Sequence, residues 1–367
     1  MPTRPHPDPA LHRAQKGRGA PSNAVPQRFG LAERLDDGDW LDAAQDIDGA
    51  APRPRTTVTE EHPRSILTFN TSPDIGFDRS INAYRGCEHG CIYCFARPSH
   101  AYHDLSPGLD FETKLFAKPN AADLLRKTLA KPGYTVRPIA MGTNTDPYQP
   151  IEGRYRITRR ILELCLEVGH PVTITTKSDR VLQDLDLLAE LARRNLAAVA
   201  VSVTSLDPRL SQSLEPRAPS PAKRLAALAQ LAKAGVTTHG MIAPVVPAIT
   251  DEFIERTVAH LAEAGVSSAN WIMMRLPHEV APLFREWLDV HYPDRAGKVM
   301  ALVQHMRGGR DNEHRFHERF RPKGAWAQML RARFDLAVRR SAIPQRRLAL
   351  DCHAFRPPSL DGQLALF

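Results

Sequence analysis

Three of the five cysteines of this 367-residue chain fall within one short run, at Cys87, Cys91 and Cys94. Three close thiolates are suited to a soft metal. A structural zinc site requires four ligands, and His89 and His100 are the neighbours that could complete one. Iron–sulfur clusters also take four cysteines in most proteins. A cluster held by three cysteines would leave one iron open to a substrate or a cofactor.

The cysteine run precedes a regular alternation of short apolar segments with longer amphipathic segments. Strands are predicted at residues 80–85, 138–143, 171–177, 197–204, 236–246 and 267–276, and helices at residues 156–169, 180–195, 221–235, 251–265 and 283–292. Apolar strands that are each followed by a helix indicate a parallel sheet covered by helices, in a (β/α) barrel or a doubly wound sheet. In such barrels the chemistry gathers in the loops after the strands. Cys165 falls in a predicted helix and is expected to be buried there.

The spacing Cys-x3-Cys-x2-Cys, with Tyr93 before the last cysteine and a strand ahead of the first, resembles the radical S-adenosylmethionine (SAM) superfamily. The resemblance implies an α/β fold, a partial (β/α)6 TIM-type barrel. It also implies that Cys87, Cys91 and Cys94 hold a [4Fe–4S] cluster whose fourth iron binds SAM. One electron from a reductant then cleaves SAM to a 5′-deoxyadenosyl radical, which abstracts hydrogen from the substrate.

From Ser65 to Leu276 the chain resembles the spore photoproduct lyase-like branch of this superfamily. This resemblance implies that the SAM site is lined or shaped by Tyr93, Thr145, Asp146, Lys177, Ser202 and Ala243. A lysine at the end of a buried strand needs an anionic partner, and the SAM carboxylate would supply one. Glu215 and Arg217 are also predicted to face the site.

In the lyase after which the branch is named, a cysteine just ahead of the turn matched here by Thr145 and Asp146 returns hydrogen to the product radical. Here residues 142–146 read Gly-Thr-Asn-Thr-Asp and carry no thiol. Photoproduct repair by the same route is therefore not expected. Either the substrate differs, or another residue donates the hydrogen, with Cys352, Tyr148 and Tyr102 as the alternatives.

The net charge of +8 is concentrated near the C-terminus. Residues 307–347 hold twelve Lys and Arg against four Asp and Glu, and they include Phe316, Phe320, Trp326 and Phe334. Mixed cations and aromatics suit a nucleic acid, although a solvated helix with its aromatics in the core would read the same. The resemblance to the spore photoproduct lyase-like branch implies lyase-like chemistry, and with this charge pattern we expect DNA or another nucleic acid as its substrate. The alternatives are a radical SAM enzyme for a small molecule or protein, and a zinc-stabilised adaptor without catalysis.

The expected organisation has four parts: an irregular N-terminal arm (1–60), the barrel (61–295), a basic, mainly helical extension (296–356) and a flexible tail (357–367). The tail ends in a pentapeptide that resembles the peptide by which bacterial polymerases and repair proteins bind the DNA sliding clamp, through Gln363, Leu364, Leu366 and Phe367. No apolar run is long enough to span a bilayer, and the N-terminus lacks a secretory signal. A cytoplasmic protein is therefore expected.

Overall fold

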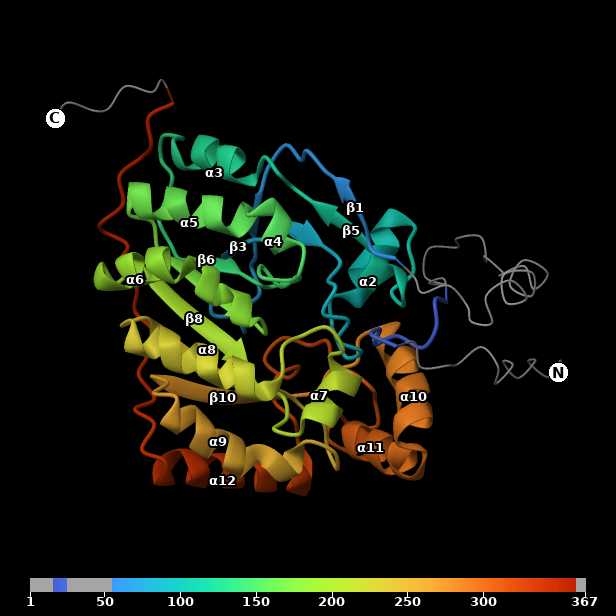
Figure 1. Ribbon diagram of the computed structural model, residues 1–367. Coiled ribbons are helices and arrows are strands. Elements are labelled where there is room, and N and C mark those ends of the chain that lie inside the picture. Colours follow the sequence, from blue (N-terminus) through green and yellow to red (C-terminus); the bar gives the residue numbers. More distant parts are fainter. Residues whose placement is uncertain (1–15, 25–54, 361–367) are drawn as a thin grey trace.

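The computed structural model describes residues 16–24 and 55–360 (Figure 1). Its main sheet has seven strands in the order β10-β9-β8-β7-β6-β3-β2. All neighbours pair in parallel except β2, which is antiparallel to β3. The strands are β2 (Leu67–Phe69), β3 (Arg79–Ile81), β6 (Ile139–Met141), β7 (Val172–Thr176), β8 (Ala197–Ser202), β9 (Thr237–Val245) and β10 (Ser268–Met273). The sheet ends at β10 and β2, so the predicted partial barrel with six parallel strands is confirmed.

Helices cover the outer face of this sheet, as Figure 1 shows for α3, α5, α6, α8, α9 and α12. The bounds are α3 (Ala121–Leu129), α5 (Ile157–Val168), α6 (Leu185–Arg193), α8 (Pro221–Lys233), α9 (Ile254–Glu263) and α12 (Gly324–Arg340). Shorter helices lie in the connections: η3 (Arg97–His103), α2 (Asp110–Thr113), α4 (Glu152–Tyr155), η4 (Asp179–Asp184), α7 (Pro208–Leu214) and η5 (Asp251–Phe253). None of the described helices has the length and apolar character needed to cross a membrane.

A second, three-stranded sheet lies beside the cysteine run, in the order β1-β5-β4. Its strands are β1 (Thr57–Glu60), β4 (Tyr84–Arg85) and β5 (Lys114–Ala117). β1 lies within the arm that was expected to be irregular. It forms a strand because its Thr-Val-Thr-Glu sequence is rich in β-branched residues and pairs in parallel with β5. The three residues Gly19, Ala20 and Pro21 of the same region are buried.

The region expected to be a mainly helical extension contains two helices and long irregular segments. α11 (Pro293–His305) packs against α10 (Val280–His291), and α12 packs against α9. Residues 306–323 and 341–360 are irregular. Gly308 and Gly309, at φ values of 63° and 84°, follow the end of α11. α12 thus continues the row of helices on the barrel.

Of the three buried apolar clusters among the described residues, the smallest joins Cys87 to Ala96 and Phe111, and the other two are larger. The larger of these two joins the strands to the helices behind them. The second lies at the carboxyl ends of the strands and joins α7, α10 and α11 to Cys91, Ile92 and Tyr93. The cysteine run is therefore packed into the fold on its apolar side.

Candidate functional site

The cysteine loop, residues 86–98, leaves β4 and turns repeatedly. The carbonyl oxygens of Cys87, Cys91 and Cys94 each accept a hydrogen bond from the backbone N–H three residues later, at 3.2, 3.2 and 3.1 Å. Gly90 adopts a φ of 67°, and a Cβ there would lie 2.7 Å from Oε2 of Glu112. Glycine is required at this turn both for its backbone angle and for its lack of a side chain.

All three thiols are free, with Cys87 and Cys91 buried and Cys94 half-buried. Burial raises the pKa of each thiol above its ordinary value. A thiolate in such surroundings needs a positive partner, and bound iron provides one. The loop can therefore offer three soft ligands from one side.

The described residues contain no group of three His, Cys, Asp or Glu side chains arranged to hold a single metal ion. The two histidines considered for zinc are engaged elsewhere. Nδ1 of His89 lies 3.3 Å from Oδ2 of Asp146, and Nε2 of His100 lies 2.8 Å from the carbonyl oxygen of Lys114. A tetrahedral zinc site requires its ligands to converge on one ion, whereas in a cluster each thiolate binds a separate iron. The donor set therefore fits a cluster better than zinc.

A buried ion pair that the sequence analysis missed fixes the loop from behind. Arg97, which is fully buried, donates to the carbonyl oxygens of Cys91 and Gly90 at 2.9 and 3.0 Å and pairs with Glu112 at 2.5 Å. Glu112 also accepts the backbone N–H groups of Gly19 and Ala20 at 3.0 and 2.9 Å. The N-terminal segment is thereby fastened to the cysteine loop.

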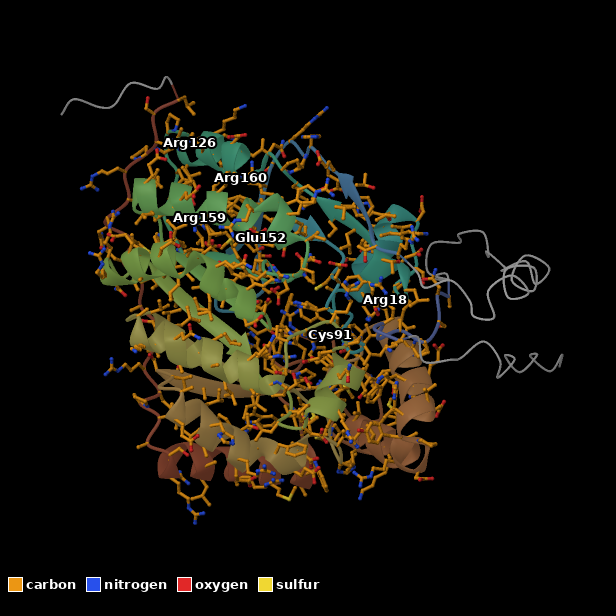
Figure 2. The ribbon with its side chains drawn as sticks, in the orientation of Figure 1. Arg18, Cys91, Arg126, Glu152, Arg159 and Arg160 are labelled. Carbon is orange, nitrogen blue, oxygen red and sulfur yellow. The ribbon has the colours of Figure 1, made fainter. Side chains whose placement is uncertain are left out.

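Figure 2 shows Arg18 of this segment beside the loop that carries Cys91. Arg18 donates to the carbonyl oxygen of Glu112 at 3.0 Å and to Oγ1 of Thr56 at 3.2 Å. Oγ1 of Thr56 in turn donates to Glu88 in the loop at 2.7 Å. In the sequence, the one signal for the buried Arg97–Glu112 pair and the segment fastened to it was an arginine three residues after the last cysteine.

Glu215 is the centre of a second buried network, on the other side of the loop. It accepts hydrogen bonds from the hydroxyl groups of Tyr93 and, at 2.7 Å, Thr204, and it forms an ion pair with Arg224. Burial raises the pKa of Glu215, although Arg224 opposes the shift. Nζ of Lys177 lies 4.0 Å from this carboxylate and 5.7 Å from the centre of the Tyr93 ring.

Asp146 joins the loops that follow β6 and β7. Its Oδ1 accepts from Oγ1 of Thr176 at 2.6 Å, and its Oδ2 accepts from the backbone N–H of Lys177 at 2.7 Å. Burial tends to raise the pKa of Asp146, but His89 and these hydrogen bonds together hold it below its ordinary value. Asp146 thus shapes the turn, and the adjacent Thr145 donates to the carbonyl oxygen of Tyr84 at 3.3 Å.

The remaining predicted residues also lie at the carboxyl ends of strands. Ser202 is buried at the end of β8, and the carbonyl oxygen of Ala243 in β9 accepts from Thr204 at 3.2 Å. Arg217, predicted to face the site, instead reaches Glu88 of the cysteine loop at 3.1 Å. The structure therefore places the predicted SAM residues on the ends of β6 to β9 and on the cysteine loop: Tyr93, Thr145, Asp146, Lys177, Ser202 and Ala243.

The three alternative hydrogen donors do not gather at this site. The residue before Cys352, Asp351, donates its N–H to the carbonyl oxygen of Asn195, ahead of β8 and so at the amino ends of the strands. Tyr148 is fully buried and donates to Asp184 at 3.1 Å, while Tyr102 is 72% exposed. The site geometry therefore selects none of them.

A family model described as the radical SAM superfamily matches residues 81–261. An uncharacterized protein of Mycobacterium tuberculosis is 38% identical over 230 residues, which are 62% of this chain and 68% of that protein. An uncharacterized protein of Methanocaldococcus jannaschii is 28% identical over 215 residues, 58% of this chain and 76% of that protein. The residues matched by the family model contain the cysteine loop and the strands from β4 to β9.

Among solved structures, spore photoproduct lyase complexed with dinucleoside spore photoproduct is similar, with a TM-score of 0.57. The similarity covers 78% of this chain and 80% of that chain at 16% sequence identity. At this identity the match is evidence for a shared fold.

Proposed function

Because this chain belongs to the radical SAM superfamily, whose members use a [4Fe–4S] cluster and SAM, we propose that it is a radical SAM enzyme that acts on a nucleic acid. Cys87, Cys91 and Cys94 are the proposed cluster ligands. One observation carries the assignment of these ligands: three free thiols lie on one tightly turned loop at the carboxyl ends of the parallel strands.

When bound, the cluster and SAM would supply the radical chemistry that removes hydrogen from the substrate. The residues of this chain bind and orient the cofactor. Lys177 is the proposed partner of the SAM carboxylate, since its ammonium lies above the Tyr93 ring and its neighbour Glu215 is already paired with Arg224. Thr145, Ser202 and Ala243 are proposed to line the rest of the SAM site.

The reductive step is tested by anaerobic reconstitution with iron and sulfide. We expect about four irons per chain, reducible by dithionite, and release of 5′-deoxyadenosine from SAM. Cys91→Ala should lose the cluster, whereas Cys165→Ala, a change of the same type at a buried thiol of α5, should retain it. Equal iron content in the two variants would contradict the ligand assignment. Zinc without 5′-deoxyadenosine would support the adaptor instead.

The nucleic-acid substrate is supported by the basic C-terminal region and by the distant fold similarity to an enzyme solved with a dinucleoside photoproduct. We propose lyase-like repair chemistry on a damaged base. SAM deuterated at the 5′ carbon should exchange label with damaged DNA. Exchange with a small metabolite or a protein, and none with DNA, would support the alternative radical SAM reaction.

The clamp-binding motif, Gln363, Leu364, Leu366 and Phe367, lies outside the described residues. We propose that it recruits the enzyme to the DNA sliding clamp, by apolar anchors and a hydrogen-bonding glutamine. Deleting the last five residues should abolish binding to the purified clamp, and unchanged affinity would refute this role. A one-electron reductant is a further proposed partner, and dithionite replaces it in the assay above.

A further inference from the structure

The segment 307–323, here called the edge loop, lies between α11 and α12. The N–H of Lys323 donates to the carbonyl oxygen of Met306 at 3.0 Å, so the two ends of the edge loop meet. Arg307 donates to the carbonyl oxygen of Met274 at 2.7 Å, and Arg319 bonds both carboxylate oxygens of Asp74 at 2.6 and 2.8 Å. Met274 follows β10, and Asp74 lies between β2 and β3. The edge loop therefore connects the two edge strands across the open side of the barrel.

The edge loop begins at the mouth of the barrel. Met274 belongs to the same buried cluster as Cys91 and Tyr93. The start of the edge loop is therefore fastened beside the buried cluster that also holds the cysteine loop.

The structure separates the twelve Lys and Arg of residues 307–347 into two groups. Five are engaged with backbone carbonyls or carboxylates: Arg307, Arg310, Arg319, Lys323 and Arg333. Seven are exposed and form no salt bridge with a described acidic residue, although Arg315 lies near enough to Glu313 to lower its pKa: Arg315, Arg321, Arg331, Arg339, Arg340, Arg346 and Arg347. The second group is available to an anionic ligand.

Three of these available arginines line two adjoining clefts. One cleft, of about 210 Å³, is formed by the edge loop, and its lining includes Arg315 and Arg321. The other, of about 320 Å³, includes Arg321, Lys323 and Arg331 and has no acidic residue in its lining. The two acidic residues of the first cleft are already engaged: Glu313 accepts backbone N–H groups, and Glu318 pairs with Lys323. The clefts therefore present unneutralised positive charge.

The aromatic residues of this region divide in the same way. Phe334 is buried, and Trp326 packs against the core. Phe320 lies beneath the guanidinium groups of Arg275 and Arg319, at 4.7 and 5.1 Å. Phe316, also on the edge loop, has the guanidinium group of Arg319 5.0 Å from the centre of its ring but is still 52% exposed. Of the four, Phe316 is thus the one placed to stack with an unpaired base.

We infer that the edge loop and the start of α12 bind the phosphate backbone of an unpaired nucleic-acid strand, with Arg315, Arg321 and Arg331 on phosphates and Phe316 on a base. The substrate is taken to be a nucleic acid, as proposed above. Guanidinium groups bind phosphate oxygens through paired hydrogen bonds, and exposed aromatic rings favour single strands, whose bases are free to stack.

The test compares the full-length holoenzyme with two triple variants that lose the same charge. Arg315→Gln/Arg321→Gln/Arg331→Gln removes the cleft arginines. Arg340→Gln/Arg346→Gln/Arg347→Gln is the control, because the N–H of Arg346 donates to the carbonyl oxygen of Ser267, at the amino end of β10. Binding of a fluorescent single-stranded oligonucleotide is measured by anisotropy over a range of salt concentrations.

The cleft variant should bind at least about tenfold more weakly at moderate salt, and its salt slope should fall by about 2, since each lost phosphate contact removes about 0.7. The control should keep the slope of the native protein. Phe316→Ala should weaken binding to the single strand more than to a duplex. Equal losses in the two triple variants, or none in either, would overturn the cleft assignment. If the native holoenzyme binds no nucleic acid, the substrate proposal fails as well, while release of 5′-deoxyadenosine separately tests the radical chemistry.

Discussion

Replacing Arg97 with methionine should destabilise the protein more than any loss of an exposed ion pair. Arg97 and Glu112 are both fully buried, and the guanidinium group also donates to the carbonyl oxygens of Cys91, Gly90, Pro107 and Gly108. Methionine matches the apolar stem but supplies no donor. Among the described residues, the buried Glu112 carboxylate would then keep hydrogen bonds only from the N–H groups of Gly19 and Ala20.

The expected loss in the free energy of unfolding is about 3–5 kcal/mol, the usual result of removing one partner of a buried pair. Arg126 provides the matched control, because its pair with Glu167 has side chains that are 35% and 52% exposed. Arg126→Met should cost less than about 1 kcal/mol. Arg97→Lys keeps the charge but not the planar fork of donors, so its cost should be intermediate.

The assay is urea unfolding of the cluster-free protein, followed by circular dichroism, with hydrogen exchange of residues 16–23 as a second readout. Arg97→Met should release the protection of the N-terminal segment, since that segment depends on a correctly placed Glu112. If Arg97→Met costs no more than Arg126→Met, the pair is not what stabilises the loop. If the amides of Gly19 and Ala20 stay protected, Glu112 holds the segment without Arg97.

Three further changes have expected outcomes. Burial raises the pKa of Glu152 to about 7, so its contribution to stability is complete below pH 4.5 and falls by up to about 3 kcal/mol as the pH rises to 7. Glu152→Gln should remove this fall from the urea midpoints measured across that pH range. An unchanged dependence of the midpoint on pH would contradict the prediction. Burial lowers the pKa of His170 to about 4, so stability is lost as the pH falls from 6.5 to 4, and His170→Gln should flatten this acid limb in the same titration. A Cβ at Gly142 would lie 1.9 Å from the carbonyl oxygen of Thr175, so Gly142→Ala should lower the free energy of unfolding by ~3 kcal/mol or more. Gly133 has a φ of 78° but open space around it, so Gly133→Ala should lower that free energy by only ~1 kcal/mol. Similar shifts in melting temperature for the two variants would refute the difference.

Local sequence patterns predicted the barrel because its strands and helices are locally encoded. Five of the six parallel strands differ from their predicted bounds by a few residues, as in β7 at Val172–Thr176 against 171–177. The first predicted strand, 80–85, is instead divided between β3 in the main sheet and β4 in the smaller sheet. The predicted helix 156–169 ends at Gly169, which is in the left-handed conformation that glycine commonly adopts after a helix. The cysteine spacing predicted a single loop, and this loop follows directly after the predicted first strand, residues 80–85.

Interactions between distant residues were not predictable in this way. The arm was expected to be irregular, yet Gly19 binds Glu112, and Asp74 binds Arg319 across most of the chain. Counting charges in residues 307–347 also overestimated the available cations, because Arg307 is buried and holds backbone carbonyls of the barrel. Such contacts depend on which distant segments the fold brings together, so they can be seen only in the folded chain.

Four carboxylates explain how a glycine-rich loop can hold its thiols in place. Each is matched by a cation or a histidine, and each ties the cysteine loop to a different element. Glu112 ties it to α2 and the N-terminal segment, Glu215 to α8, Asp146 to the loops after β6 and β7, and Glu88 to the α7–α8 connection. An unconstrained loop would lose conformational entropy when iron binds, and these contacts already bear that cost in the folded chain. The spacing of the cysteines therefore determines which ligand the loop can bind, while the carboxylates around it determine that the loop is ordered before the ligand arrives.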